Sequence, residues 1–315
     1  MFRRMTFPLI SVVTPCYNEE ANVREMYEAV RTVFAALPKY RYEHVFIDNA
    51  SRDLTPRVLR DLAAADPNVK VILNARNFGH VRSGYYALLQ TRGDAVIAMA
   101  CDFQDPPSLI PEFLQRWEAG SRVVLGVKSA SEESGVFYAL RDRYYSILSR
   151  IADIQVVKQS TGFGCYDRMV IEALRRIDDP YPYFRGLIAE IGYEPAIVPF
   201  TQPARKRGIS SQNFYTLYDL AFLGIVNHSK VPLRMATMAG FGLAALSLLV
   251  ALGYLIYKLL YWNQFTVGIA PILIGFFFLT SVQLFFIGIV GEYIGSIYTQ
   301  VRHHPHVFEK DRINF

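Results

Sequence analysis

Short apolar runs alternate with helix-like segments along the first part of the chain. Leu9–Thr14 and His44–Asp48 are rich in β-branched and apolar residues, which is typical of buried strands. Glu19–Leu37 has apolar residues at helical spacing, and Thr55–Ala65 is a second predicted helix with Pro56 near its first position. The alternation continues through the segments Val69–Leu73, Val81–Leu89, Ala95–Ala100, Ser108–Trp117 and Val123–Leu125. This order predicts an α/β fold, a mostly parallel sheet with helices on both faces.

Polar, turn-rich segments follow three of the predicted strands. They are Pro15–Glu20, Asp48–Asp53 and Asp102–Pro107. Ligands of such sheets bind beyond the carboxyl ends of the strands. We therefore expect the functional site to be built from these three segments.

Two long apolar segments occupy the C-terminal part of the chain. Met235–Tyr257 and Asn263–Gly291 contain no charged residue, and a helix needs about 20 apolar residues to cross a bilayer. A buried core helix is the alternative, but the length and the pairing of the segments argue against it. Basic residues flank both sides, namely Arg205, Lys206, Arg207, Lys230, Arg234, Arg302, Lys310 and Arg312. This pattern predicts a multi-pass protein of the inner (plasma) membrane with its catalytic part on the cytoplasmic side.

Composition narrows the functional classes. Apolar residues make up 52% of the chain and charged residues 19%, with a net charge of +5. Arginines are not interleaved with stacking aromatics over any useful length, so nucleic-acid binding is not expected. Three distant cysteines without a CxxC pair indicate reduced thiols. Leu9–Thr14 is too short for a signal peptide, so we expect the catalytic part to stay in the cytosol.

These patterns predict four parts of the chain. Residues 1–209 form the catalytic domain and 210–233 an interfacial amphipathic helix or linker, for which a soluble core helix is the alternative. Residues 234–298 form two transmembrane helices, at about 235–257 and 266–291, and 299–315 a cytoplasmic tail.

Four motifs occur at the predicted strand ends in a characteristic order. They are Pro15-Cys-Tyr-Asn-Glu-Glu20, Asp48-Asn-Ala-Ser-Arg-Asp53, Arg76-Asn-Phe-Gly79 and Asp102-Phe-Gln-Asp-Pro-Pro107. As an ordered set they resemble the family 2 glycosyltransferases. The resemblance is stronger to the polyisoprenyl-phosphate group, which contains dolichyl-phosphate mannosyltransferases and bacterial undecaprenyl-phosphate glucosyltransferases. It covers nearly the whole chain and implies a GT-A fold and a homo-oligomer such as a tetramer.

A nucleotide-sugar site is expected at the first three motifs. A nucleoside needs hydrogen-bond acceptors for its ribose and base, which the carboxylates of Glu19 and Asp48 offer, beside an apolar wall of Pro15 and Tyr17. The alternatives are compensation of a helix dipole for Glu19 and turn formation for Asp48. With the resemblance, the predicted nucleotide-sugar-binding residues are Pro15, Tyr17, Asn18, Glu19, Asp48, Asn49, Arg76 and Asn77.

A metal site is expected at the fourth motif. Mg²⁺ or Mn²⁺ on Asp102 and Gln104 would offset the charge of a departing diphosphate, which makes Asp102 a predicted catalytic residue. Ala100 stands where the family usually has another aspartate, so fewer protein ligands are present. Mg²⁺ accepts this because it keeps waters and binds substrate phosphates. For Asp105 we prefer a role in the turn before Pro106.

Positive charge is expected where a lipid phosphate approaches. Arginine forks hold phosphate oxygens well, and the predicted lipid-phosphate ligands are Lys128, Arg141, Arg143, Arg205 and Arg207. By resemblance, Arg205 is also a catalytic arginine on a loop over the site. Ser160–Gly164 lacks the aspartate that relatives use as a proposed base. A phosphate acceptor is mostly dianionic at neutral pH and needs no strong base.

The expected reaction is inverting transfer of a hexose from a UDP-sugar to polyprenyl (undecaprenyl) phosphate on the cytoplasmic membrane face. The product would serve cell-envelope glycan modification or protein glycosylation, and glucose is favoured by resemblance. A GDP-mannose-dependent dolichyl-phosphate mannose-type synthase is an alternative. A processive polysaccharide synthase is disfavoured because only Gln115-Arg-Trp117 approaches its Gln-x-x-Arg-Trp signature. Ala100 and the missing base leave an inactive membrane scaffold as a further alternative.

Overall fold

A computed structural model describes residues 7–130, 157, 159–177, 179–203, 231–261, 269–302 and 304–315. Its strands are β1 (Leu9–Cys16), β2 (Arg41–Asp48), β3 (Val69–Asn74), β4 (Ala95–Ala98), β5 (Val123–Ala130), β6 (Ser160–Asp167), β7 (Ala196–Thr201) and β8 (Glu309–Ile313). Its helices are α1 (Val23–Ala35), α2 (Thr55–Ala65), α3 (His80–Leu89), the 3₁₀ helix η1 (Pro107–Leu109), α4 (Ile110–Glu118), α6 (Arg168–Arg176), α7 (Phe184–Ile191), α9 (Val231–Leu260) and α10 (Ile269–Val301).

The strands form one mixed eight-stranded sheet of order β7-β5-β6-β4-β1-β2-β3-β8. β4, β1, β2 and β3 run parallel, as the sequence predicts, and β5 runs parallel to β7. β6 is antiparallel to both β4 and β5, and β8 is antiparallel to β3. Because β6 reverses direction, its start at Ser160 lies at the same edge as the carboxyl ends of β4 and β5.

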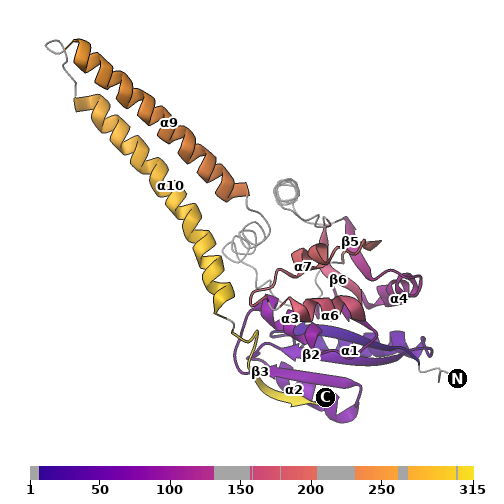
Figure 1. The fold of residues 1–315 in the computed structure, drawn as a ribbon. Coiled ribbons are helices and arrows are strands. Elements are labelled where there is room, and N and C mark those ends of the chain that lie inside the picture. The colour runs from indigo at the N-terminus through magenta and orange to yellow at the C-terminus, as the bar shows by residue number, and fades with distance from the viewer. Residues whose placement is uncertain are drawn as a thin grey trace.

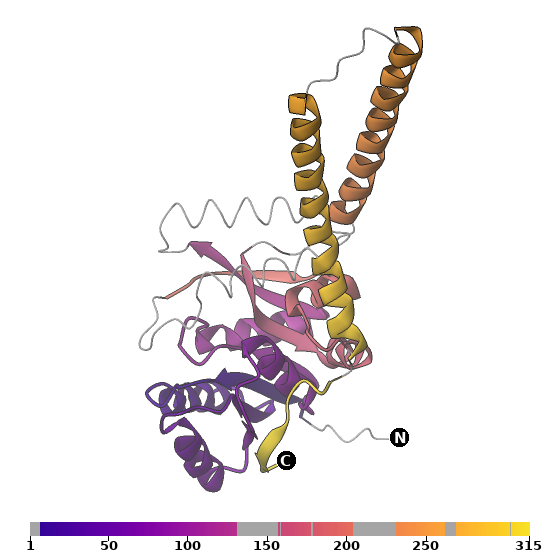
Figure 2. The same cartoon turned by 90° about the vertical axis from the view of Figure 1, so that its left-hand side faces the viewer.

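Helices cover both faces of the sheet, as Figures 1 and 2 show. Neighbouring strand residues point to opposite sides, so Val12 belongs to a core with α1, α2 and α4, and Val13 to a core with α3, α6 and α7. Both cores consist of fully buried aliphatic and aromatic side chains. The predicted architecture, helices on both faces of an α/β sheet, is confirmed.

Helix α1 begins later than its apolar spacing suggests. Glu19 lies in a turn, in which its carbonyl oxygen accepts hydrogen bonds from the amides of Asn22 and Val23 at 2.9 and 3.0 Å. Asn18 just before it has a left-handed backbone, with φ of 56°. The chain must turn between β1 and α1, and this turn uses residues that the periodicity assigned to the helix.

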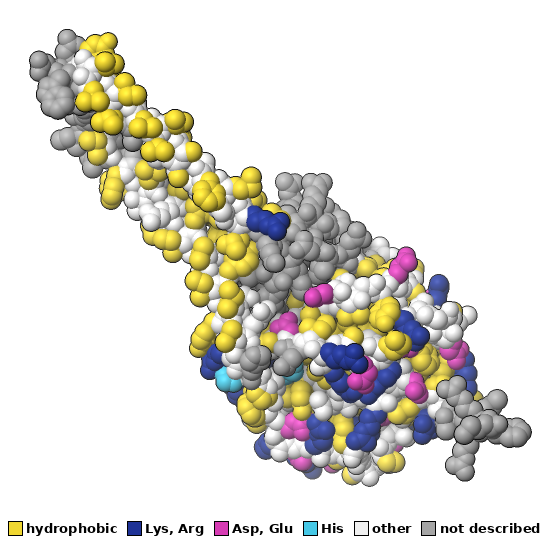
Figure 3. All heavy atoms as spheres, viewed as in Figure 1, with side chains coloured by type: hydrophobic (Ala, Val, Ile, Leu, Met, Phe, Trp, Pro, Cys, Tyr) yellow, Lys and Arg dark blue, Asp and Glu magenta, His cyan; other side chains and the backbone are white. Residues whose placement is uncertain are grey.

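Two long apolar helices lie side by side and project away from the sheet (Figures 1 and 2). Leu233–Tyr257 in α9 and Gly275–Val301 in α10 are long and apolar enough to cross a membrane, and none of either apolar window is buried. Figure 3 shows their surface covered by hydrophobic side chains, while charged side chains gather on the sheet-bearing part. α10 continues past the predicted end at residue 291. The predicted interfacial helix at 210–233 lies outside the described residues except for its last three, which begin α9.

The last residues of the chain complete the sheet. From the sequence, 299–315 is predicted as a cytoplasmic tail with no strand assigned there, and Glu309-Lys-Asp-Arg-Ile313 indeed shows no apolar alternation. In the structure, Ile313 pairs with Val71 and Asp311 with Leu73 along the edge of β3. Charged residues are common on edge strands, where they discourage further pairing. This strand was missed because pairing with β3, rather than local sequence, creates it.

Candidate functional site

Each of the three polar segments contains one non-glycine residue with a left-handed backbone. These residues are Asn18, Ala50 and Phe103, with φ of 56°, 60° and 64°. Such backbones are uncommon outside glycine and cluster at functional sites. Because β4, β1 and β2 are parallel neighbours in the sheet, the three turns lie side by side at its carboxyl edge, where the sequence predicts the site.

The first two segments are hydrogen-bonded to each other. The Asn18 amide donates to Ser51 Oγ at 2.8 Å, and Asn18 Oδ1 accepts from the Arg52 amide at 2.8 Å. The Glu19 amide donates to Thr55 Oγ1 at 2.9 Å, and the Glu19 carboxylate accepts from Asn22 Nδ2 at 2.6 Å. The Asn18 side chain thus supports the loop, and contact of Asn18 or Glu19 with a nucleotide stays a prediction.

Asp48 is the last residue of β2, lies at this carboxyl edge of the sheet and is buried. Its Oδ2 accepts from the Ser51 amide at 3.0 Å, while its buried Oδ1 has no hydrogen-bond partner. Burial raises the pKa of the Asp48 carboxyl, and the negative charge of Asp53 adds to the effect. A buried carboxylate oxygen without a partner costs free energy. An N–H or O–H donor of a ligand would remove that cost.

Asn49 and Asn77, two predicted nucleotide ligands, also build the neighbouring loop, and their contact with a nucleotide stays a prediction. Asn49 Oδ1 accepts from the Phe78 amide at 2.9 Å and from Asn74 Nδ2 at 3.2 Å. Asn49 Nδ2 donates to Asn77 Oδ1 at 2.9 Å, which also accepts from the Gly79 amide at 2.8 Å. These side chains hold the loop 75–79 against the end of β2, a supporting role that the motif alone did not reveal.

Arg76 belongs to this loop, and Pro15 and Tyr17 are the residues of the predicted apolar wall. The Arg76 guanidinium lies 4.0 Å from the centre of the Phe78 ring, a cation–π contact. Pro15 and Tyr17 are partly exposed at the rim, as an apolar wall requires. Their contact with a nucleotide stays a prediction.

The fourth motif forms a compact acidic turn. Asp102 is 5% exposed, and its Oδ1 accepts from the Gln104 amide at 3.1 Å. Asp105 Oδ2 accepts from the Ala100 amide at 2.9 Å. The pKa of Asp105 is raised to about 6, chiefly by burial and also by the nearby Asp102, although the Ala100 amide and Lys128 act to lower it. Asp105 therefore supports the turn, as preferred from the sequence, and also adds buried negative charge beside Asp102.

The donor set of this turn fits a divalent cation only in part. Among the described residues, no three His, Cys, Asp or Glu side chains are grouped so that they could hold a metal ion. Asp102 and Gln104 bring one carboxylate and one amide oxygen, and Ala100 brings no side-chain oxygen. The mutual repulsion of Asp102 and Asp105 is a cost that a cation would relieve. Such a sparse oxygen set suits Mg²⁺ or Mn²⁺ held jointly by protein, water and a diphosphate.

Among the side chains predicted to bind the lipid phosphate, Lys128 is the one that the structure describes. It stands near the end of β5, and its amide donates to the carbonyl of Gln159 at 3.3 Å. Its charge acts on Asp105, so it belongs to the same edge as the acidic turn. Arg141, Arg143, Arg205 and Arg207 lie outside the described residues.

A cation that the sequence interpretation did not assign lies beside the start of β6. Arg185, on α7, donates from Nη1 to the carbonyl of Ser160 at 3.1 Å. It lines a cavity of about 340 Å³ together with Ser160, Tyr166 and Tyr193. The sequence Phe184-Arg-Gly-Leu187 is also a motif of the family that the chain resembles, but no role was assigned to its arginine.

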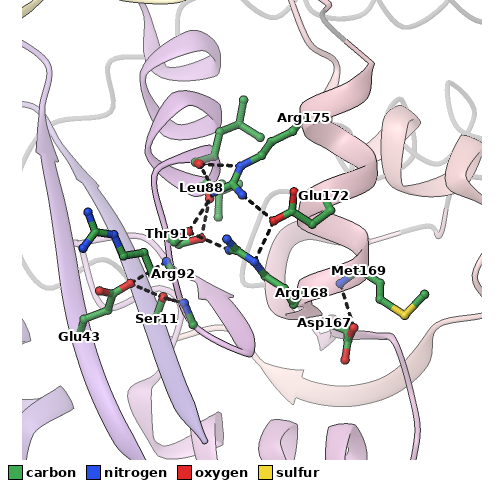
Figure 4. A network of polar contacts seen from close by, with 12 residues as sticks. Ser11, Glu43, Leu88, Thr91, Arg92, Asp167, Arg168, Met169, Glu172 and Arg175 are labelled. Carbon is green, nitrogen blue, oxygen red and sulfur yellow. Dashed lines mark hydrogen bonds and ion pairs between the residues drawn. The ribbon is translucent and has the colours of Figure 1, made fainter. Parts of the chain in front are cut away.

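The opposite edge of the sheet carries a different polar network, drawn in Figure 4. Glu43 accepts from Ser11 Oγ at 2.5 Å and from the Arg92 amide at 3.0 Å, and it pairs with Lys70. Arg168 donates to the Thr91 carbonyl at 2.7 Å and pairs with Glu172 at 3.0 Å. These bonds join β1, β2, β3, α6 and the turn between α3 and β4, so we interpret them as structural.

Comparisons with known proteins show the family of the chain. The signature of Glycosyl transferase family 2 matches residues 11–175. The chain belongs to this family. It is similar to a bactoprenol glucosyl transferase of Shigella phage SfV, with 33% identity over 94% of this chain and 96% of the relative. It is also similar to the putative glycosyltransferase CsbB of Bacillus subtilis, with 31% identity over 96% and 92% of the two chains.

Among solved structures, glucosyl-3-phosphoglycerate synthase from Mycobacterium tuberculosis superposes with a TM-score of 0.46 and 19% identity, over 70% of this chain and 78% of that one. The predicted enzyme class is confirmed by the family match, and the protein is a glycosyltransferase.

Proposed function

We propose that this glycosyltransferase transfers glucose from UDP-glucose to polyprenyl phosphate at the cytoplasmic face of the inner membrane. The carrying observation is the buried Asp48 with one unbonded carboxylate oxygen, at the same edge as Asp102 and Gln104. Asp48 thus offers a hydrogen-bond acceptor to an N–H or O–H group of the nucleobase or ribose. Asp102 and Gln104 offer oxygen ligands to a cation that is bound to the diphosphate. The similarity to bactoprenol glucosyl transferases supports glucose as the sugar and bactoprenyl phosphate as the acceptor.

The acceptor half of the proposal rests on the two long apolar helices. A polyprenyl phosphate keeps its chain in the bilayer and exposes only its phosphate, so the enzyme must stay near the surface. α9 and α10 are suited to this by length and composition. Lys128, with the predicted Arg141, Arg143, Arg205 and Arg207, would supply the positive charge that lets a lipid phosphate approach a diphosphate.

The proposed reaction is a single displacement. An oxygen of the lipid phosphate attacks C1 of the hexose, and the bond from C1 to the β-phosphate oxygen breaks, its electron pair leaving with UDP. Attack opposite the leaving group inverts the anomeric configuration. The acceptor phosphate, with its second pKa about 6, is already mostly dianionic at pH 7, so no base is needed to remove a proton. A divalent cation bound at Asp102 and Gln104 would offset the charge of the leaving diphosphate.

The decisive experiment supplies purified full-length protein with labelled UDP-glucose, UDP-galactose, UDP-N-acetylglucosamine or GDP-mannose, and with undecaprenyl phosphate in detergent. We expect a lipid-linked hexose from UDP-glucose only. A product from GDP-mannose alone would favour the mannose-type synthase. If no donor yields lipid-linked sugar, and calorimetry detects neither UDP nor Mg²⁺ binding, the scaffold alternative is correct.

A homo-oligomer, such as a tetramer, is a further part of the proposal and rests on the family resemblance alone. Light scattering of the detergent-solubilised protein, corrected for bound detergent, tests it. A monomeric mass would remove this part without affecting the reaction.

A further inference from the structure

Residues 306–308, which follow α10, pack directly on the loop 75–79, which the proposed function places at the nucleotide-sugar site. The Phe308 carbonyl accepts from the Ala75 amide at 2.8 Å, and the rings of Phe308 and Phe78 lie 6.2 Å apart between centroids. Val307 is 4% exposed, and the His306 ring meets the Tyr85 ring edge-on at 5.1 Å. Figure 1 shows this segment running from the end of α10 past α3 to the edge of β3.

The segment is anchored along its whole length. Near its start, Glu309 Oε1 accepts from the Tyr86 hydroxyl at 2.9 Å. Further on, Asp311 pairs with Arg60 at 2.6 Å. At its far end, Asn314 Nδ2 donates to the carbonyls of Ala63 and Val69 at 2.7 and 2.9 Å. The near anchors touch the loop and α3, whereas the far anchor touches the opposite end of β3.

A chain of contacts leads from Phe308 to the buried carboxylate of the donor site. Phe308 packs on Phe78, and the Phe78 amide donates to Asn49 Oδ1 at 2.9 Å. Asn49 directly follows Asp48. The pairing of β3 with β8 becomes irregular between Leu73 and Asn74, where β3 gives way to this loop. The position of the loop thus depends on contacts from both sides, Asn49 on one and Phe308 on the other.

The same segment is a short tether to the apolar helix. α10 ends at Val301, and seven chain steps lead from there to Phe308. An extended chain spans at most about 3.5 Å per residue, so the end of α10 stays within about 25 Å of the donor loop. The distance between α10 and the loop 75–79 is therefore limited by this short connection for as long as Phe308 stays docked on the loop.

We propose that residues 306–313 form a positioning clamp for the reaction, with Phe308 as its positioning residue. The clamp holds the loop 75–79 in the conformation that binds the nucleotide and limits its distance from the membrane end of α10. It rests on the proposed function, because it assigns this loop to the donor site. The competing explanation is a passive cover of the β3 edge, under which near and far anchors would have equal effects.

The first test compares Phe308→Ala, just before β8, with Asn314→Ala, a matched control just after β8. UDP binding is measured by calorimetry on full-length protein, alongside the thermal midpoint. We expect Phe308→Ala to weaken UDP binding about tenfold and Asn314→Ala less than about twofold, although both lower the midpoint. Phe308→Tyr, which keeps the ring, should restore binding and serves if the alanine variant fails to fold.

Equal UDP affinity for wild type, Phe308→Ala and Asn314→Ala would overturn the clamp, as would equal weakening by the two alanine variants. Absence of UDP binding by the wild type would instead contradict the proposed function, so the two failures are distinguishable.

The tether is tested by inserting six Gly/Ser residues between His304 and Pro305, which leaves the docked segment intact. We expect unchanged UDP affinity, unchanged transfer to a short-chain polyprenyl phosphate in solution, and about tenfold slower transfer to undecaprenyl phosphate in vesicles. Unchanged transfer in vesicles would show that the tether length has no role.

Discussion

Two carboxylates near opposite ends of the same strand, β2, are equally buried and differently bonded. Glu43 and Asp48 are 3% and 2% exposed. Glu43 receives hydrogen bonds from Ser11 and the Arg92 amide and pairs with Lys70. The Ser51 amide donates to Asp48 Oδ2, and Asp48 Oδ1 has no hydrogen-bond partner.

Their pKa values move in opposite directions. Burial alone would raise the pKa of Glu43, but Lys70, Ser11 and the Arg92 amide together outweigh burial and lower it. For Asp48 burial dominates and the pKa is raised. Because burial is the same, the difference lies in the partners that the fold provides. The amino edge of the sheet is satisfied internally, whereas the carboxyl edge keeps an acceptor available to a ligand.

The largest expected effect is on catalysis at the carboxyl edge. Asp102→Asn keeps the oxygen that accepts from the Gln104 amide but removes the charge. We expect the transfer rate to fall about 10³-fold, because the leaving diphosphate loses its cation, while unfolding in urea stays within about 0.5 kcal/mol. Glu112→Gln, at an exposed pair with Arg116, is the control and should leave both unchanged. A fully active Asp102→Asn would contradict the metal assignment.

At the amino edge we expect the converse, a loss of stability without a loss of ligand binding. Glu43→Ala leaves the Lys70 ammonium, whose side chain is only 13% exposed, without its partner. The free energy of unfolding, measured in urea, should fall by about 3 kcal/mol, with UDP affinity unchanged. Glu118→Ala, which breaks a largely exposed pair with Lys39, should cost less than about 1 kcal/mol. A loss of UDP affinity in Glu43→Ala would contradict the assignment of a structural role to the amino edge and of ligand binding to the carboxyl edge.

A smaller effect depends on pH. His44, beside Glu43, is buried, and burial lowers its pKa from 6.5 to about 3. Between these values the unfolded chain binds a proton that the folded chain does not, so stability falls as pH decreases below 6.5. We expect about 1.5 kcal/mol of this loss between pH 6.5 and 5. Urea unfolding of wild type and His44→Gln at pH 6.5 and pH 5 isolates the contribution of His44. An equal pH dependence of stability in the two proteins would refute this prediction.

The smallest expected effect concerns Asp48 itself. Asp48→Asn removes the charge that burial disfavours, so stability should stay equal or rise by about 1 kcal/mol, while UDP affinity falls about tenfold. Calorimetry with UDP and urea unfolding measure the two. Asp66→Asn, at a carboxylate that accepts from the Tyr27 hydroxyl, is the control and should not change UDP affinity. Unchanged UDP binding in Asp48→Asn would give Asp48 a structural role like that of Glu43.

Much of the carboxyl edge was predictable because short-range signals mark it. The bounds of α2 match the prediction, since Pro56 near the first position and apolar spacing are local. The three polar segments meet because parallel strands bring their carboxyl ends together. The supporting roles of Asn49 and Asn77 were not predictable, because each depends on a backbone amide or side chain from another loop.

The amino acid order by itself determined the alternation of strands and helices, the two apolar spans and the motif set of the family. These are carried by residues close in sequence, so periodicity and charge reveal them. Only the tertiary structure decided that one oxygen of Asp48 lacks a hydrogen-bond partner while Glu43 has three partners, and that the charged segment Glu309–Ile313 pairs with the edge of the sheet beside the loop 75–79. Partners brought from distant segments set the free energy of a buried charge or an edge strand, and folding alone brings them together.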